Sequence, residues 1–100
     1  MIECDKIIAV IEKDATGYRK LKDNSGHYCV IGGLLHEIGM EPVLYQLYPD
    51  VPELNALHQV YGLDKSAIAV LMSTNDSYSK TMQRREELIK VVNDWRNSEV

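Results

Sequence analysis

Residues 28–38, with the sequence YCVIGGLLHEI, restrict the possible folds of this chain more than any other stretch. Apolar residues recur there with the three- and four-residue spacing of one helix face, at Tyr28, Ile31, Leu35 and Ile38. The neighbouring faces are apolar as well, and a helix that is apolar nearly all round is buried. Gly32 and Gly33 each cost a helix about 1 kcal/mol relative to alanine, so we expect another element to approach closely there. The stretch therefore predicts a buried helix that Gly39 ends.

Apolar side chains on one face also predict a helix near each end of the chain. In the segment 3–14 they are Cys4, Ile7, Ile8 and Ile11. Cys4 is therefore expected to be a small core residue rather than a functional one. In a helix expected from about residue 80 to residue 96 they are Leu88, Val91, Val92 and Trp95.

Capping residues predict two more helices in the middle of the chain. Asp50 and Glu53 have the spacing of a capping box at the start of the third helix, and Gly62 ends it. Asp64 then caps a fourth helix, whose apolar pattern stops before the polar segment 73–79. We expect that segment to be a loop.

A chain of 100 residues is long enough for a single domain, 1–100, with one core. Its predicted elements give a mainly α fold, a small orthogonal helical bundle of about five helices. The stretch 41–50 alternates as a strand does, but no second clear strand is available to pair with it. We expect an extended connector there, or at most a minor β-hairpin with residues 18–22.

Cys29 is the clearest candidate for covalent chemistry. A thiol becomes nucleophilic when a helix N-terminus or a nearby imidazole lowers its pKa. Cys29 is expected in the first turn of its helix, with His27 close by, whereas His36 lies about 10 Å along the helix axis. Unpaired cysteine is also among the most frequently buried residue types, and we favour that structural interpretation. A Cys29-dependent hydrolase or transferase, supported by His27 and by Asp76 or Asn75, is the alternative.

Residues 55–73 have the apolar spacing of a helix-turn-helix, which raises DNA binding as a further alternative. The would-be recognition helix, 64–76, holds one lysine and no arginine, although such a helix normally presents basic and amide side chains to DNA. The whole chain has a formal net charge of −4, which disfavours contact with phosphates. We therefore do not expect nucleic-acid binding, since a plain αα-hairpin has the same spacing.

The start of the chain, MIECDKIIAV, lacks the basic leader and long apolar run of a signal peptide. No apolar run reaches the roughly 20 residues that a membrane helix needs. We therefore expect a cytoplasmic protein without membrane contact, in which Cys4 and Cys29 are reduced. Two cysteines and three dispersed histidines form no spaced metal motif, so the sequence predicts neither a metal nor another cofactor.

Several short motifs resemble those of a group of small bacterial and phage-associated proteins, which carry a Tyr-Cys-Cys-Leu-Gly helix start and a Leu-Asn-Asp motif before the last helix. The matching residues here are Tyr18, Leu21, Tyr28, Cys29, Gly32, Val51, Pro52, Gly62, Leu63, Asn75 and Asp76. Val30 replaces the second cysteine and Thr74 replaces the leucine, and the missing cysteine counts against a dithiol or metal role. The resemblance implies a fold type and a phage or mobile-element setting, but no activity.

The leading hypothesis is a small non-catalytic binding or protein-interaction module. Its expected working surface is a groove formed by the polar loop 17–28, the start of the second helix and the segment before the last one, because loops with such side chains often carry sites. The candidate binding residues are Tyr18, His27, Tyr28, Cys29, Asn75 and Asp76. The expected partner is another protein or a small polar ligand.

Overall fold

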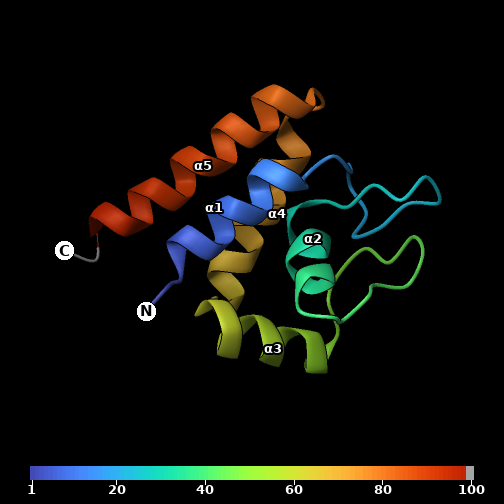
Figure 1. The fold of residues 1–100 in the computed structure, drawn as a ribbon, viewed down its shortest axis with the longest axis horizontal. Helices are drawn as coiled ribbons and strands as arrows, with labels where there is room; N and C mark the ends of the chain where they lie inside the picture. The colour runs from blue at the N-terminus through green and yellow to red at the C-terminus, as the bar shows by residue number, and fades with distance from the viewer. Residues whose placement is uncertain (99–100) are drawn as a thin grey trace.

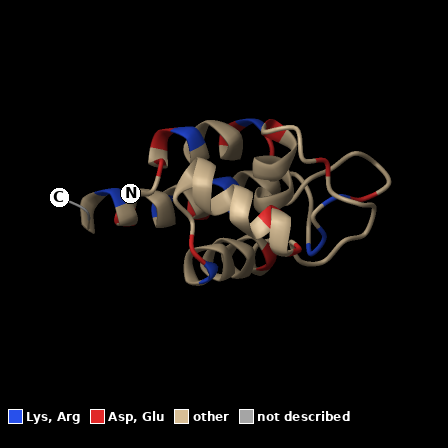
Figure 2. Cartoon of the chain, turned by 90° about the horizontal axis from the view of Figure 1, so that it is seen from below, with Lys and Arg blue, Asp and Glu red and all other residues tan. Residues whose placement is uncertain are grey.

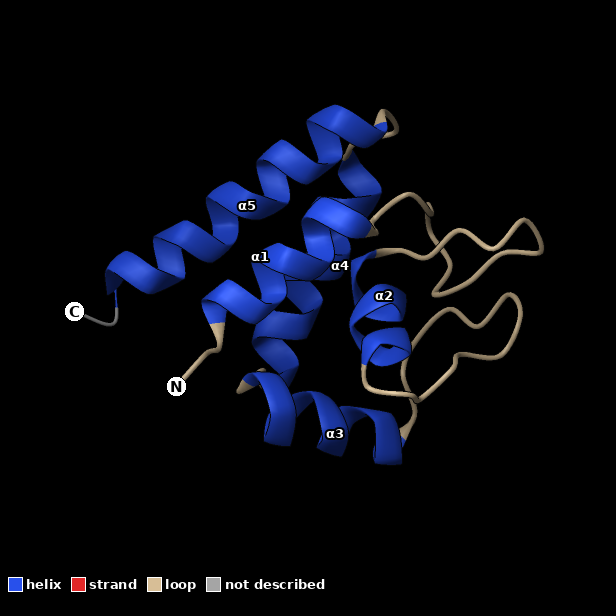
Figure 3. Cartoon of the chain, in the orientation of Figure 1, coloured by secondary structure: helices blue, strands red, loops and turns tan. Residues whose placement is uncertain are grey.

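Residues 1–98 are described by a computed structural model, and within them the chain forms five α-helices joined by loops (Figure 1). The helices are α1 (Cys4–Lys13), α2 (Val30–Glu37), α3 (Val51–Tyr61), α4 (Lys65–Ser77) and α5 (Thr81–Ser98). Figure 3 shows helices and loops only, and the sole β-type pairing found in residues 1–98 is an isolated antiparallel bridge between Lys22 and Tyr28. The predicted mainly α bundle is confirmed.

The helices surround α2, the shortest of the five described. It packs against α1, α3 and α4, while α5 covers α1 and α4 on the other side. In Figure 1, α1 and α5 run side by side, and α3 lies at an angle to them at the lower edge of the bundle. The loops before and after α2 project together from one end of the bundle.

The two glycines of α2 are explained by close approach, as predicted. A Cβ atom on Gly32 would lie 1.8 Å from the backbone oxygen of Leu21, and one on Gly33 would lie 2.8 Å from the Cβ atom of Asp14. The loop that follows α1 therefore crosses directly over α2. Only glycine leaves enough room for the backbone at this crossing.

The predicted helix caps are also confirmed. The Asp50 side chain accepts a hydrogen bond from the backbone N–H of Glu53 at 3.1 Å, and the Glu53 carboxylate accepts one from the N–H of Asp50 at 2.8 Å. Gly62 ends α3 in the left-handed region, at φ 73°. Asp64 caps α4 by accepting from the N–H of Ala67 at 2.8 Å.

Two predicted boundaries are wrong. Tyr28 was expected on the buried face of α2, but the helix starts at Val30, and Tyr28 is a half-buried residue of the preceding loop. The segment 73–79 was expected to be a loop, but residues 73–77 continue α4. Buried hydrogen bonds to Asn75 stabilise this last part of α4, although its polar residues favour turns when considered locally.

The last helix, α5, is the longest of the described part of the chain. Leu88 and Val92 from its predicted apolar stripe are fully buried against the rest of the core. Among residues 1–98, neither this helix nor any other has both the length and the apolar character needed to span a membrane.

Candidate functional site

Asn75, expected to bind a ligand or to cap the last helix, is instead a completely buried side chain in α4. Its Oδ1 accepts a hydrogen bond from the first backbone N–H of α2, that of Val30, at 3.0 Å. Its Nδ2 donates to the backbone oxygen of Gly17 at 3.3 Å. The amide thus connects α4, α2 and the loop before α2. Because both ends of the amide are satisfied by backbone groups, its role is structural.

Cys29 lies next to this amide and is 3% exposed. It is the N-cap of α2 rather than a first-turn residue, and its Sγ accepts a hydrogen bond from the N–H of Gly32 at 3.4 Å. Burial raises the pKa of the thiol to about 11. The expectation that the helix dipole would favour a thiolate is therefore wrong, because removal from water outweighs the dipole. The structure gives the hydrolase or transferase alternative no accessible, ionised nucleophile.

Asp76 and Tyr18 adjoin the buried region at its surface. The Oδ1 atom of Asp76 accepts a hydrogen bond from the backbone N–H of Arg19 at 2.9 Å. The ring of Tyr18 contacts two guanidinium groups, with the Cζ atoms of Arg19 and Arg84 at 5.0 Å and 5.4 Å from its centroid. Tyr18 is thus held in a defined position while 37% of it stays accessible.

Arg84, near the start of α5, is a charged side chain that the fold buries. It is 1% exposed and donates to three backbone oxygens, those of Ala15, Tyr78 and Ser79, at 2.8–2.9 Å. These bonds join the start of α5 to the loop that follows α1. Burial lowers the pKa of the guanidinium. Arg84 therefore links these segments through its hydrogen bonds, and its guanidinium is shielded from solvent.

His27 is exposed and its imidazole faces Asp23, whereas Cys29 is buried. The Nδ1 atom of His27 is 3.5 Å from a carboxylate oxygen of Asp23, and its backbone N–H donates to the other oxygen at 3.0 Å. The same oxygen of Asp23 accepts from the N–H of Ser25 at 2.9 Å. These bonds order the tip of the loop and lower the pKa of Asp23, since they favour its carboxylate form.

A cluster around Glu41 was missed at the level of sequence. The Glu41 carboxylate binds Nζ of Lys22 at 2.7 Å, Nδ1 of His36 at 2.5 Å and the hydroxyl of Tyr28. The rings of Tyr28 and His36 stack with their centroids 4.6 Å apart. These contacts lower the pKa of Glu41 to about 2. The Glu41 cluster therefore ties the loop before α2 to the loop after it.

The second missed feature is an apolar surface on the loop after α2 and the first residue of α3. Six large apolar or aromatic side chains between positions 43 and 51 are 48–72% exposed. They form what we call the apolar loop face: Val43, Leu44, Tyr45, Leu47, Tyr48 and Val51. The sequence predicts a connector for this stretch, but the outward direction of its apolar residues depends on tertiary contacts.

Those contacts run through Gln46, in the middle of the face. Its backbone oxygen accepts from the N–H of Leu21 at 2.7 Å. Its side chain accepts from the N–H of Val43 at 3.0 Å and donates to the backbone oxygen of Tyr48 at 2.9 Å and to Glu53 at 2.6 Å. One polar side chain turned inward thus organises a loop whose apolar side chains are turned outward.

Buried prolines at both ends and contacts of Tyr45 also fix the apolar loop face. Pro42 and Pro49 are buried. The N–H of Tyr45 donates to the backbone oxygen of Lys22 at 2.9 Å, and Nζ of Lys20 lies 4.9 Å from the Tyr45 ring centroid. Tyr45 itself has φ 62°, a left-handed conformation that an aromatic residue rarely adopts. The conformation of the apolar loop face is therefore fixed by contacts with the loop before α2.

Comparison of the chain with protein-family models, with curated proteins and with solved structures finds no match. The residues of the predicted site divide into two groups in space. Asn75 and Cys29 are buried supports, with the half-buried Asp76 next to Asn75 in α4. Tyr18, His27 and Tyr28 lie on the loop beside the apolar loop face. Within residues 1–98, no three His, Cys, Asp or Glu side chains gather in a way that would hold a metal ion.

Proposed function

We propose that this protein is a small, non-catalytic interaction module of the cytoplasm that binds a partner protein through the apolar loop face. The observation that carries the proposal is the exposure of six large apolar side chains on one ordered nine-residue stretch, 43–51. Large contiguous apolar surfaces are uncommon on monomeric proteins and mark interaction sites, and neighbouring positions along one short ordered stretch favour such a surface here. The resemblance of the sequence motifs is the only basis for proposing a phage or mobile-element setting.

The order of the loop supports this function. Leaving a Leu or Val side chain in water forgoes about 1.5–3 kcal/mol of burial, so a loop free to rearrange would turn such residues inward. The hydrogen bonds of Gln46 and the backbone pairing with Leu21 and Lys22 oppose that rearrangement. A surface that is already in place has less conformational entropy to lose on binding.

The chemistry of the face favours protein over nucleic acid. Tyr45 and Tyr48 present large, rigid rings with a polar end, a residue type enriched at the energetic centres of protein interfaces. Figure 2 shows acidic and basic positions interspersed along the ribbon, and the formal net charge of −4 disfavours binding to a phosphate backbone. The helix-turn-helix alternative gains no support from α4, whose exposed positions include Ser66, Ala69 and Val70.

A photo-crosslinking experiment tests the proposal. A benzophenone amino acid replaces Leu47 on the face or, as a matched control, Met82, which is 84% exposed on α5. Each protein is irradiated in an extract of the producing cells. We expect a defined adduct from position 47 that excess unlabelled wild-type chain suppresses, and none from position 82.

The double variant Leu44→Ser/Leu47→Ser completes the test. It should fail to suppress the adduct, and with the purified partner it should bind at least about tenfold more weakly, whereas Met82→Ser should bind as the wild type does. Suppression by the double variant equal to that by the wild type would refute the proposal. An adduct between two copies of the chain would mean that the face forms a homodimer instead of binding a different protein. Binding only to phospholipid vesicles would mean that the face contacts a membrane.

A further inference from the structure

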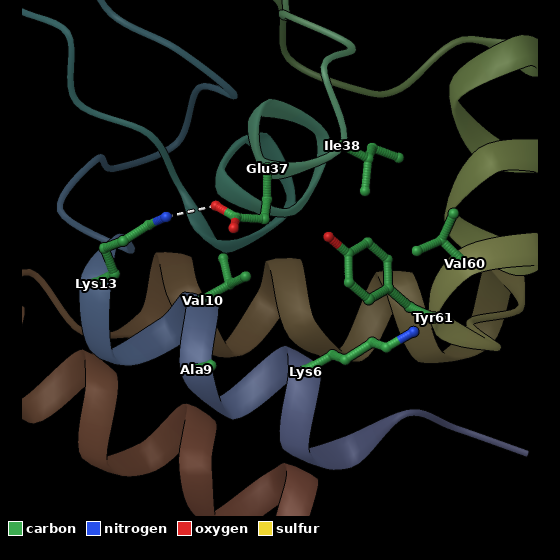
Figure 4. A pocket seen from close by; sticks show the side chains of 8 residues that line it. All are labelled: Lys6, Ala9, Val10, Lys13, Glu37, Ile38, Val60 and Tyr61. Carbon is green, nitrogen blue, oxygen red and sulfur yellow. Dashed lines mark hydrogen bonds and ion pairs between the residues drawn. The ribbon is translucent and has the colours of Figure 1, made fainter.

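A second potential binding site lies away from the apolar loop face, where α1 meets the ends of α2 and α3 (Figure 4). The pocket there has a volume of about 460 Å³, within the range of about 300–1,000 Å³ found for small-molecule sites. Its walls are largely apolar, with Val10 on α1, Ile38 after α2, and Val60 and the ring of Tyr61 on α3. It shares no residue with the apolar loop face.

Charged groups lie at the edge of this pocket. Lys13 and Glu37 form an ion pair across one end, drawn as a dashed line in Figure 4. Each partner neutralises the other, and the ion pair raises the pKa of Lys13 while it lowers that of Glu37. The other cation of the lining is Lys6, whose nearest ion-pair contact, Glu3, is 4.0 Å away, at the outer limit for such a pair. The charge of the lining is therefore one positive unit in excess.

Lys6 carries this positive charge and lines the same pocket as the apolar residues. It does so from α1, as Figure 4 shows. The Tyr61 hydroxyl is already used, because it donates to the backbone oxygen of Leu34 at 2.8 Å. Burial raises the pKa of this hydroxyl to about 12, so it remains neutral. Because the Tyr61 hydroxyl and the Lys13–Glu37 pair are already engaged, the ammonium of Lys6 is the polar group of the lining most available to orient a ligand.

We infer that the pocket binds a small amphipathic carboxylate, with its apolar body against Val10, Ile38 and Val60 and its carboxylate paired with Lys6. A few polar groups beside a mostly apolar wall are typical of sites that fix both the place and the direction of a small ligand. An ammonium group favours an anion over a neutral molecule of the same shape. This site is separate from the protein-binding surface, and either can exist without the other.

Octanoate and octanol, which share a chain of equal length and differ in charge, are the probes. Binding to the full chain is followed by the NMR shifts of the methyl groups of Val10, Ile38 and Val60. We expect octanoate to bind about threefold to fivefold more tightly than octanol, as for a partly exposed ion pair. The variant Lys6→Gln should remove this preference, while Lys90→Gln, on α5 and outside the pocket, should preserve it.

A second variant, Val60→Trp, fills the pocket and should abolish octanoate binding; its circular dichroism shows whether the helices remain. If it fails to fold, Ala9→Leu, from the α1 side of the lining, replaces it. Equal affinities for octanoate and octanol would overturn the inference. So would octanoate shifts confined to residues 43–51, which would assign the probe to the apolar loop face.

Discussion

The region around Asn75 and the apolar loop face depart from the usual distribution of polar and apolar residues in opposite directions. Around Asn75, a polar side chain is completely buried, yet its amide is matched by the backbone of Val30 and Gly17 and by the carboxylate of Asp76. On the loop face, apolar side chains are in water, and within the described structure nothing covers them. A satisfied buried amide needs no ligand, whereas an exposed apolar surface gains free energy when something covers it. Function is therefore better assigned to the second region than to the first.

The largest expected effect comes from breaking the crossing on which both regions depend. In an unobstructed helix, Gly32→Ala would stabilise the protein by about 1 kcal/mol. Here the added Cβ would lie 1.8 Å from the backbone oxygen of Leu21, so we expect a loss of at least about 3 kcal/mol in the free energy of unfolding, measured with urea. Gly26→Ala is the control, because nothing lies within 4 Å of its Cβ position, and its left-handed φ of 79° should cost only about 1 kcal/mol. A Gly32→Ala variant as stable as wild type would mean that the loop does not cross α2 as described.

The next effect tests whether the buried amide is structural. Asn75→Ala leaves the N–H of Val30 and the oxygen of Gly17 without partners, which should cost about 2–3 kcal/mol in urea unfolding. Asn55→Ala, at an exposed position of α3, is the matched control and should change stability by less than about 0.5 kcal/mol. If Asn75→Ala left stability unchanged but removed partner binding, the original assignment of Asn75 to a binding site would be restored.

These two regions also show what sequence reasoning can and cannot reach. The caps of α3 are local: Asp50, Glu53 and Gly62 act within one helix, so the sequence predicts them correctly. The end of α4 is not local, because Asn75 is stabilised by Gly17 and Val30, 58 and 45 positions away. Considered alone, the segment STNDS favours a turn, and no pattern within it reports those distant partners.

The same distinction applies to the candidate site. The alternation in 41–50 is visible in the sequence, but the direction of its side chains depends on the bonds of Gln46 to Glu53 and Leu21. Glu41 looks like an ordinary surface carboxylate until the fold brings Tyr28 and His36 to it. Sequence periodicity predicts which side chains form the core of a helix, but not which loops are held together across the bundle.

The Glu41 cluster links the two regions, and a smaller effect is expected there. Its folded-state pKa of about 2 is below the ordinary value of 4.5, so its stabilising effect is present above pH 4.5 and is lost as the pH falls towards 2. Because the side chain is 44% exposed, solvent limits this contribution to about 1 kcal/mol or less. We expect Glu41→Gln to be less stable than wild type at pH 7 and nearly equal to it near pH 2, as measured by urea unfolding. Glu86→Gln, an exposed carboxylate on α5, controls for the loss of one negative charge, and a difference that does not change with pH would contradict the cluster.

The smallest effect on stability, and the sharpest separation of stability from binding, is expected at Tyr45. Its left-handed backbone costs about 1–2 kcal/mol for a residue with a side chain, and Tyr45→Gly would relieve that cost. Greater freedom of the unfolded chain and loss of the contact with Lys20 would offset most of the gain, so we expect unfolding to change by less than about 0.5 kcal/mol.

Binding should respond differently, because the variant removes one of the two tyrosine rings of the apolar loop face. We expect the affinity for the partner to fall by at least about tenfold. Arg19→Gly is the matched control: Arg19 is also exposed and left-handed, at φ 65°, but lies outside the face, so its substitution should leave binding within about twofold. If Tyr45→Gly bound as tightly as wild type, the left-handed tyrosine would be a feature of loop geometry alone. Loss of binding at unchanged stability would instead mean that the loop holds a strained residue because the partner needs its ring.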